Sequence, residues 1–287
     1  MDCSEVRFAY ESRSQCYKFV FLGDVHAGSA DTDEGLVREV ARRLEEPDTY
    51  WFDLGDRCEF INMRDRRFEV GGLADWITVG DMADLPAAQM EKYASWFGGV
   101  ADKCIVGLCR NHEGTIRKWY ERDVYRELNR KLGLYDEPRG FEVNGTRTPG
   151  FGGFVRMKFT RTFDNGKRGT TWTLTVFVHH GAGGGQLAGA KALRLERLPM
   201  AFDADVFAVG HTHTKLAVIK RRVGMSGHKR LKLMDRPVVL INVGAFMRSY
   251  VQNGADGYVV QRMFYPQGLG PVELWVWPDK REVRVFQ

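Results

Sequence analysis

Side chains with metal-binding chemistry recur at the ends of short apolar runs along the chain. Core packing does not readily explain why imidazole and carboxylate groups recur at the end of one apolar run after another. Imidazole nitrogen together with carboxylate and amide oxygen suits Zn²⁺, Mn²⁺ or Fe, and the absence of ligating cysteines argues against a closed structural zinc site. The pattern therefore predicts a divalent-metal site. Its members are six of the seven histidines (His26, His112, His179, His180, His211 and His213) together with Asp24, Asp56 and Asn111.

Two of these groups have a spacing that would serve one metal cluster. Asp24 and His26 are two residues apart, as are His211 and His213. In extended backbone, residues i and i+2 project to the same side, so each pair can present two donors together. Glycines directly before these groups let the backbone bend where each strand ends.

The apolar runs are typical of β-strands covered on both faces, because their apolar residues are consecutive rather than alternating. Ligands in open α/β sheets converge at the carboxyl ends of the strands, so these polar residues are expected to meet in space. Helical patterns between the runs indicate a layered α/β domain. The six runs are residues 16–24, 49–56, 104–112, 172–181, 205–211 and 238–246.

Two helices are predicted between these strands, one within residues 31–47 and one spanning residues 115–133 that ends at Gly133. Residues 60–100 join two strands by more than a normal crossover, which predicts a helical insertion with a helix from Leu85 to Val100. The sequence does not show whether this insertion is a lid over the site or a dimer contact. Residues 271–287 are typical of a closing hairpin.

Five sequence blocks, in order, resemble the signature blocks of the calcineurin-like metallophosphoesterases, whose pattern is D-x-H, G-D-x-x-[DN], G-N-H-[DE], a lone strand-end His and G-H-x-H. The resemblance covers most of the chain. It implies a single domain over residues 1–287 with the family's fold, a four-layer α/β/β/α sandwich of two mixed β-sheets flanked by helices. The blocks are G-D-V-H (23–26), G-D-R-C-E (55–59), R-N-H-E (110–113), H-H-G (179–181) and G-H-T-H (210–213).

The resemblance also implies two divalent metal ions, with Mn²⁺ as the first expectation and Zn²⁺, Fe or Ni²⁺ as alternatives. Metals about 3.5–4 Å apart would share a hydroxide that attacks phosphorus. His112 would contact the phosphate and protonate the leaving oxygen. The implied ligands are Asp24, His26 and His213 for one metal and Asn111, His179 and His211 for the other, with Asp56 bridging them.

Three positions depart from the family's pattern or leave it ambiguous. Glu59 replaces the usual Asp or Asn, which we expect to affect support of the bridging site rather than ligation. Arg110 replaces the usual Gly, and either contacts substrate phosphate or is an ordinary surface arginine. His179 and His180 compete for one ligand position, since only one of two successive strand residues faces the site. We predict His179, the first polar residue after the apolar run, and leave His180 as a supporting or substrate-contacting residue or one turned away.

The net charge of +5 is unevenly distributed. Residues 215–236 hold eight Lys and Arg against Asp235 alone, a local net charge of +7, which leaves −2 for the rest. This segment is typical of a hairpin with Gly224 to Gly227 at its turn. It indicates either a polyanionic partner, nucleic acid or nucleotide, or a solvated basic face.

Cysteine usage and hydropathy bear on the compartment. Five cysteines, an odd number, fit buried thiols in a reduced cytoplasmic interior better than a disulfide framework. No apolar run reaches the roughly 18 residues of a transmembrane helix. The N-terminus is charged throughout and lacks the apolar core of a secretory signal. We therefore expect a cytoplasmic protein with no membrane partner; its oligomeric state stays open.

The function expected from the sequence is metal-dependent hydrolysis of a phosphate ester, of the phosphodiesterase or nuclease kind on nucleic acid or nucleotides. The basic hairpin favours this over the alternative, a phosphomonoesterase acting on a small metabolite or phosphoprotein. A third hypothesis is a non-catalytic binding scaffold with the same fold. Scaffolds of this kind typically lack metal ligands or the catalytic histidine. All the ligand positions and His112 are present here.

Overall fold

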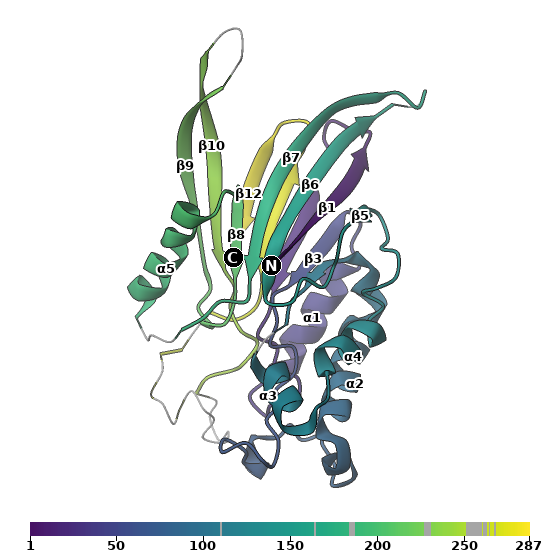
Figure 1. Ribbon diagram of the computed structural model, residues 1–287, viewed down its shortest axis with the longest axis vertical. Helices are drawn as coiled ribbons and strands as arrows, with labels where there is room; N and C mark the ends of the chain where they lie inside the picture. The colour runs from purple at the N-terminus through teal and green to yellow at the C-terminus, as the bar shows by residue number, and fades with distance from the viewer. Residues whose placement is uncertain are drawn as a thin grey trace.

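Two mixed β-sheets lie face to face, with helices on both outer sides (Figure 1). The computed structural model describes residues 1–109, 111–163, 165–183, 187–226, 231–250, 260, 263, 265–266 and 268–287. The seven-stranded sheet has the order β5 (Glu142–Asn144), β1 (Asp2–Tyr10), β6 (Gly152–Thr162), β7 (Arg168–His179), β8 (Val206–Val209), β10 (Lys232–Asn242) and β9 (Leu216–Ser226). The five-stranded sheet has the order β12 (Glu282–Phe286), β11 (Val272–Trp277), β2 (Tyr17–Leu22), β3 (Thr49–Asp53) and β4 (Cys104–Gly107).

The helices divide between the two outer sides, which makes four layers. Three apolar clusters fill the spaces between them: one between the sheets, one under the helices of the five-stranded sheet, and one between the seven-stranded sheet and α5. This is the α/β/β/α sandwich expected from the sequence. The helices are α1 (Glu34–Leu44), α2 (Leu85–Phe97), α3 (Asn111–Tyr120) and α4 (Val124–Lys131) on one side and α5 (Ala188–Ala201) on the other.

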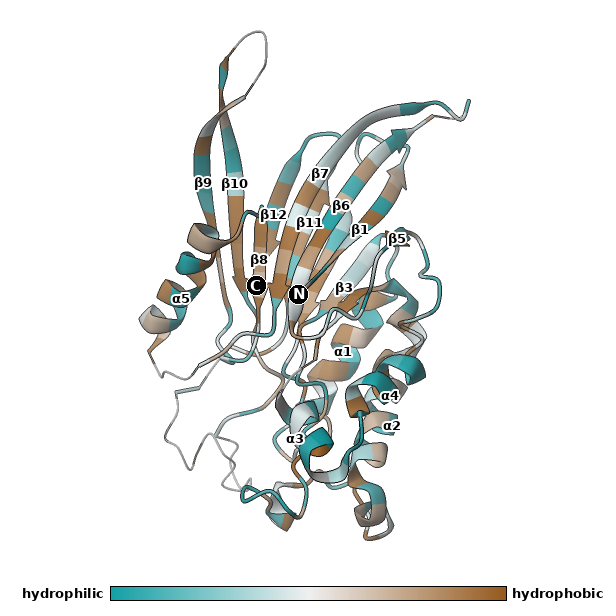
Figure 2. Ribbon diagram, viewed as in Figure 1, coloured by the Kyte–Doolittle hydropathy of each residue, from teal (hydrophilic) through white to brown (hydrophobic). Residues whose placement is uncertain are grey.

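Aromatic side chains fill the space between the sheets. The ring of Phe8 from β1 lies 5.2 Å from that of Phe159 in β6 and 5.5 Å from that of Phe19 in β2, centroid to centroid. All three side chains are buried. The apolar positions concentrate in these central strands (Figure 2). Because rings from both sheets pack on one another, the sheets share one core.

The helix predicted within residues 31–47 is α1. The Asp33 carboxylate caps its first turn by accepting a hydrogen bond from the Leu36 backbone N–H at 3.0 Å. Val37, Val40 and Leu44 are buried against the five-stranded sheet. The opposite face is solvated, as an amphipathic pattern requires.

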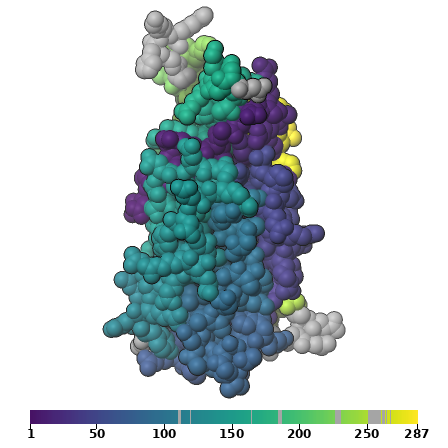
Figure 3. Space-filling view, turned by 90° about the vertical axis from the view of Figure 1, so that its right-hand side faces the viewer, coloured from purple at the N-terminus to yellow at the C-terminus, as the bar shows by residue number. Residues whose placement is uncertain are grey.

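The helix predicted from Leu85 to Val100 is α2, which ends at Phe97 and continues as a 3₁₀ turn over Gly98–Lys103. It connects the parallel neighbours β3 and β4 and packs Phe97 on Trp51 of β3, with ring centroids 5.3 Å apart. The helical part of the segment is therefore a crossover helix of the sheet. In the space-filling view, the blue and teal side chains of this helical layer close the lower part of one face (Figure 3).

The single helix predicted over residues 115–133 is wrong, because the chain forms two helices there. Glu121 has left-handed backbone (φ 56°), which ends α3. The Asp123 carboxylate then caps α4 by accepting from the Arg126 N–H at 3.0 Å. Gly133, also left-handed (φ 67°), follows α4 as predicted. The apolar periodicity continued across the break and concealed it.

Both predicted hairpins form. β11 and β12 pair antiparallel over residues 272–286, and β9 pairs with β10. Gly224, predicted at the turn, lies instead inside β9 and pairs with Met234, while Gly227 lies outside the described residues. Strands β1, β5 and β6 were not predicted, because exposed and buried residues alternate along β1 and no uninterrupted apolar run marks it. None of the helices within the described residues is long and apolar enough to cross a membrane.

Candidate metal centre

The candidate ligands lie at the carboxyl ends of strands from both sheets. β2 and β3 are parallel neighbours and lead to Asp24 and Asp56, while β7 and β8 are parallel neighbours and lead to His180 and His211. The His180 side chain crosses between the sheets, since its Nδ1 lies 2.5 Å from the Leu54 carbonyl oxygen after β3. Topology therefore brings together residues that are far apart in the sequence.

The backbone at these positions is left-handed rather than extended, so the extended geometry assumed for the two i, i+2 pairs is wrong. The φ angles of Asp24, His26, Asp56, His211 and His213 lie between 51° and 68°. Such a conformation costs a non-glycine residue on the order of 1–3 kcal/mol, and it persists where surrounding bonds hold it. Here the Asp24 N–H donates to the Gly55 carbonyl at 2.9 Å and the His26 N–H to the Asp56 carbonyl at 3.1 Å.

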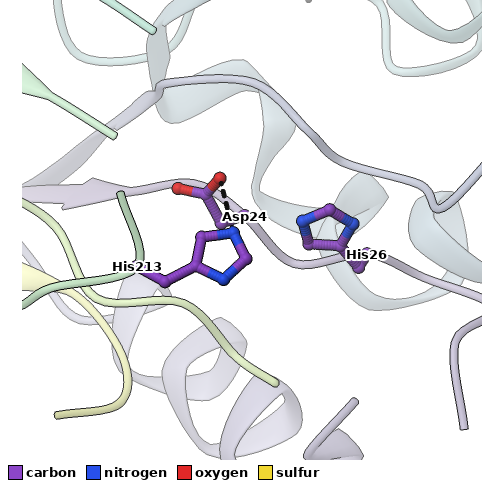
Figure 4. Close-up of side chains that lie close together, drawn as sticks. All are labelled: Asp24, His26 and His213. Atoms are coloured by element: carbon purple, nitrogen blue, oxygen red, sulfur yellow. Dashed lines mark ion pairs between the residues drawn. The ribbon is translucent and has the colours of Figure 1, made fainter. Parts of the chain in front are cut away.

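One cluster consists of Asp24, His26 and His213, whose candidate ligand atoms all lie within 4.8 Å of one another (Figure 4). His213 Nε2 is 3.3 Å from Asp24 Oδ1. The other carboxylate oxygen, Oδ2, accepts a hydrogen bond from the His211 backbone N–H at 2.8 Å. Asp24 therefore both offers one oxygen to the cluster and fixes the loop that carries the histidines.

The second cluster consists of Asp56, His180 and His211, again within 4.8 Å. His180 is fully buried, and its Nε2 lies 3.2 Å from Asp56 Oδ2 and 3.9 Å from Asp24 Oδ1. With Nδ1 directed at the Leu54 carbonyl, Nε2 is the nitrogen that faces the carboxylates. The two clusters are thus adjacent.

The structure does not support the predicted preference for His179 over His180. Strand β7 alternates, so Phe177 and His179 face α5 while Val178 and His180 face the other sheet. The His179 ring lies parallel to that of Phe177 at 6.4 Å, and its Nδ1 accepts from the Gly181 N–H at 2.9 Å. Thr171, Thr173 and Thr175 alternate with Trp172, Leu174 and Val176 along β7. This alternation places His180 on the apolar face, a signal that the prediction of His179 did not use.

Glu59 contacts His26 and, together with His26 and His112, forms a third group whose candidate ligand atoms lie within 4.8 Å of one another, so its role as a support rather than a ligand stays a prediction. Glu59 Oε2 lies 2.6 Å from His26 Nδ1. Burial lowers the pKa of His26, but the Glu59 carboxylate outweighs burial and raises it to about 9. The backbone carbonyl of Glu59 also lies 2.5 Å from His112 Nδ1, so one residue orients both histidines.

Buried polar atoms in these clusters fit bound cations. Among the described residues, His26 Nε2 and Asp56 Oδ1 are buried and have no hydrogen-bond partner. Burial raises the pKa of both Asp24 and Asp56, but nearby histidines, His213 for the first and His180 for the second, outweigh it and lower both values. Two buried carboxylates close to imidazole nitrogens form a donor set that suits a divalent cation.

A buried arginine underlies the Asp56 turn, and the sequence analysis missed it. Arg57 is fully buried, its Nε is 2.5 Å from Asp53 Oδ2, and its Nη1 donates to the Asn129 side chain of α4 at 2.6 Å. Tyr93 of α2 donates to the same Asp53 oxygen at 2.9 Å. A Cβ on Gly107 would lie 2.1 Å from Arg57 Nη2, so a side chain at this position of β4 would displace the guanidinium. The sequence gives no signal that distinguishes this arginine from a surface one.

Asn242 and Lys191 support the loop of His211 and His213. Asn242 Nδ2 donates to Thr212 Oγ1 at 2.8 Å and also to the Thr214 carbonyl. Lys191 Nζ, from α5, donates to the Thr212 carbonyl at 2.9 Å and to Thr214 Oγ1 at 2.5 Å. Burial lowers the pKa of Lys191. These contacts hold the loop in the left-handed conformation that both histidines adopt.

Asn111 and Arg110 are the predicted site residues that the structure does not describe in full. Asn111 is the first residue of α3, whereas β4 ends at Gly107, so Asn111 lies beyond the strand end at which it was predicted. Arg110 and the side chain of Asn111 lie outside the described part of the structure.

No protein-family model matches the chain, and no curated protein matches it. Among solved structures, the chain aligns with a conserved uncharacterized protein from Streptococcus pneumoniae TIGR4 that is a predicted phosphoesterase. The alignment covers 95% of this chain and 98% of that one, at 9% identity and a TM-score of 0.32. At these values the likeness is no argument for function.

Proposed function

We propose that this chain is a metal-dependent phosphoesterase that binds two divalent cations. The observation that supports the proposal is the adjacency of the two clusters, Asp24–His26–His213 and Asp56–His180–His211, through the His180 imidazole. We assign the first cluster to one cation and the second to the other, with Asp56 between them and Asn111 completing the second. Mn²⁺ is the proposed native cation.

Cations bound there would supply Lewis acidity toward a phosphoryl oxygen and lower the pKa of a coordinated water. His112 is the proposed general acid. With Nδ1 held by the Glu59 carbonyl, its Nε2 is the atom that would hold the proton for the leaving oxygen. The ring lies 5.3 Å from that of His26, so this proton would be carried next to the first cluster.

The test combines metal content with hydrolysis of bis-p-nitrophenyl phosphate in a matched pair of variants. We expect two Mn²⁺ per chain in the native protein and at most one in His180→Ala, with loss of activity. His179→Ala, which removes the neighbouring imidazole from the other face, should keep both cations and the activity. Loss of metal in His179→Ala alone would contradict the assignment, and less than half a metal in the native protein would favour a binding scaffold.

The His112→Ala variant tests the acid role separately from metal binding. We expect it to retain two Mn²⁺ and to lose about 10²–10⁴-fold in kcat on an alkyl phosphodiester. The loss should be smaller on an aryl ester, because a phenolate leaves without needing a proton. Equal losses on both esters would contradict the role.

For the substrate class we propose a phosphodiester of nucleic acid or a nucleotide, which the net charge of residues 215–236 supports. Part of this charge is compensated within the chain: Lys220 pairs with Glu196 at 2.9 Å, Arg221 with Asp235 at 2.5 Å and Arg222 with Asp203 at 3.0 Å. A panel with Mn²⁺ that compares phosphodiesters, p-nitrophenyl phosphate, cyclic nucleotides and single- and double-stranded DNA separates this class from a phosphomonoesterase. Higher kcat/KM on the monoester would overturn the proposal.

A further inference from the structure

The outer parts of β9 and β10 form a two-stranded ribbon that rises past the rest of the sheet (Figure 1). Their antiparallel register sets Met225 opposite Leu233, Val223 opposite Asp235 and Ile219 opposite Val239. Directly opposed residues in a sheet share one face. One face of the ribbon, here called the inner face, therefore carries Ile219, Arg221, Val223 and Met225 from β9 with Leu233, Asp235 and Pro237 from β10.

The inner face continues the core surface between the two sheets. At the base of the ribbon, Val239 and Ile241 are buried in that core and Ala217 packs against it. Gln287, after β12, donates to the Ala217 carbonyl at 3.1 Å. Beyond this contact the same face becomes exposed: the exposed fraction is 46% for Ile219 and 66% for Val223. It reaches 74% for Met225 and 81% for Leu233.

Apolar positions continue up both strands of the ribbon (Figure 2). A two-stranded ribbon on its own is marginally stable in water, and a contiguous exposed apolar face marks an interaction surface. Because the inner face is covered by a second β-sheet at its base, a second β-layer is the cover that its geometry fits.

The charges on the ribbon favour one occupant for this face. Among its described residues, which exclude 227–230, the inner face carries one Arg and one Asp; these pair at 2.5 Å and leave this part of the face neutral. The opposite face carries Lys220, Arg222, Lys232 and Arg236, of which the first two pair with acids on or next to α5. Nucleic acid or an anionic lipid surface would select the basic face. The neutral inner face, with one charge of each sign near its middle, complements itself under a two-fold axis.

We propose that the inner face of the β9–β10 ribbon binds the same face of a second copy of this chain. The two ribbons stack as a small β-sandwich with Val223, Met225 and Leu233 buried between them. Arg221 of each copy lies near Asp235 of the other. This inference is independent of the metal centre and of the proposed activity.

Sedimentation velocity of the full chain tests the proposal, with a dimer of twice the 32.8 kDa chain mass as the expected species. Leu233→Asp should shift the dimer to monomer and weaken association by at least about 100-fold, since it places a charge in the apolar interface. Lys232→Glu, the neighbouring residue on the opposite face, is the matched control and should leave the dimer intact.

Charge-reversal variants test the same interface in case Leu233→Asp does not fold. Arg221→Asp and Asp235→Arg each set like charges against each other in a homodimer, so each variant alone should be monomeric. Mixed together they should form a dimer, because opposite charges then face each other across the interface. Only a contact between copies predicts recovery on mixing.

Three results would overturn the proposal. One is a native chain that stays monomeric up to about 100 µM, a concentration at which even a weak specific dimer is populated. The second is a dimer that survives both Leu233→Asp and the charge reversals. The third is a monomer that binds vesicles of phosphatidylglycerol and loses this binding in Leu233→Asp, which would assign the inner face to a lipid surface.

Discussion

His26 shows how a candidate ligand is oriented through the nitrogen that it does not present to the cluster. The Glu59 carboxylate at Nδ1 leaves Nε2 buried and directed into the site. Outer partners of this kind tune metal affinity because they fix both the tautomer and the ring orientation. Glu59 occupies a position where a shorter Asp or Asn was expected, and its longer side chain reaches the candidate ligand His26.

Glu59→Gln should lower Mn²⁺ affinity about 10- to 100-fold while the fold is kept, since it removes the charge but preserves the side-chain volume. Isothermal titration calorimetry measures this directly. Asp65→Asn serves as the control, because Asp65 lies in the same segment and pairs with Arg67 rather than with a ligand. An unchanged Kd for Glu59→Gln would show that the hydrogen bond to His26 has no effect on metal binding.

The reactivity of the cysteine thiols is expected to depend on their burial. Burial raises the pKa of Cys104 to about 12 and the pKa of Cys58 well above its usual value, whereas Cys3 is exposed. The thiolate is the reactive form, so at about pH 8 Cys3 should react rapidly with a disulfide reagent while Cys58 and Cys104 should react only after unfolding. Fast labelling of Cys58 in the native protein, located by mass spectrometry, would contradict this.

At the scale of elements, the Asp56 turn is connected to two helices through Arg57. Its guanidinium joins Asp53 at the end of β3 to Asn129 of α4, while Tyr93 of α2 holds the same aspartate. Removing one partner of a buried ion pair leaves the other charge without compensation. These contacts connect α2 and α4 to the turn that carries Asp56 of the second candidate cluster.

Arg57→Met should lower the free energy of unfolding by about 3–5 kcal/mol, because Asp53 keeps its buried charge. Urea unfolding measures the change. Arg122→Met is the matched control: Arg122 also bonds two carboxylates, Asp84 and Glu127, but at the surface, where we expect a loss of about 0–1 kcal/mol. Comparable losses in the two variants would show that the Arg57 network adds nothing beyond an ordinary surface pair.

At the scale of the whole molecule, one aromatic core connects the two sheets. We predict that residues 1–287 unfold as a single domain, so far-ultraviolet circular dichroism and tryptophan fluorescence should give coincident urea transitions. Phe8→Ala, at the centre of the core, should move both transitions together and cost about 3–5 kcal/mol. Two separated transitions would indicate that the sheets fold as independent units.

Ion pairing within the chain limits what the basic segment can contribute to nucleic-acid binding. For duplex DNA the slope of log K against log salt is about −0.9 per phosphate neutralised. The slope therefore gives the number of Lys and Arg side chains that contact DNA phosphates. We expect Lys232→Glu with Arg236→Glu to flatten the slope measured by fluorescence anisotropy, because neither side chain is ion-paired in the described structure. A flat slope in the native protein would exclude this segment as a DNA contact.

The sequence by itself indicated the layered α/β class and the strand-end His and Asp residues from which most of the candidate site is built. Strand-end His and Asp residues are readable because both features are local: an apolar run, then a polar residue after a glycine. Such features involve only neighbouring residues, so they can be predicted from the sequence before the fold is known.

The tertiary structure alone decided which groups meet. The distances show that His180, rather than His179, faces the carboxylates, and the alternation of Thr with apolar residues along β7 agrees with this orientation. The left-handed backbone at five candidate ligands depends on bonds between loops of different strands. Arg57 becomes a buried partner of Asp53 only once α2 and α4 cover it. The last two features depend on contacts between distant segments, which no local pattern records.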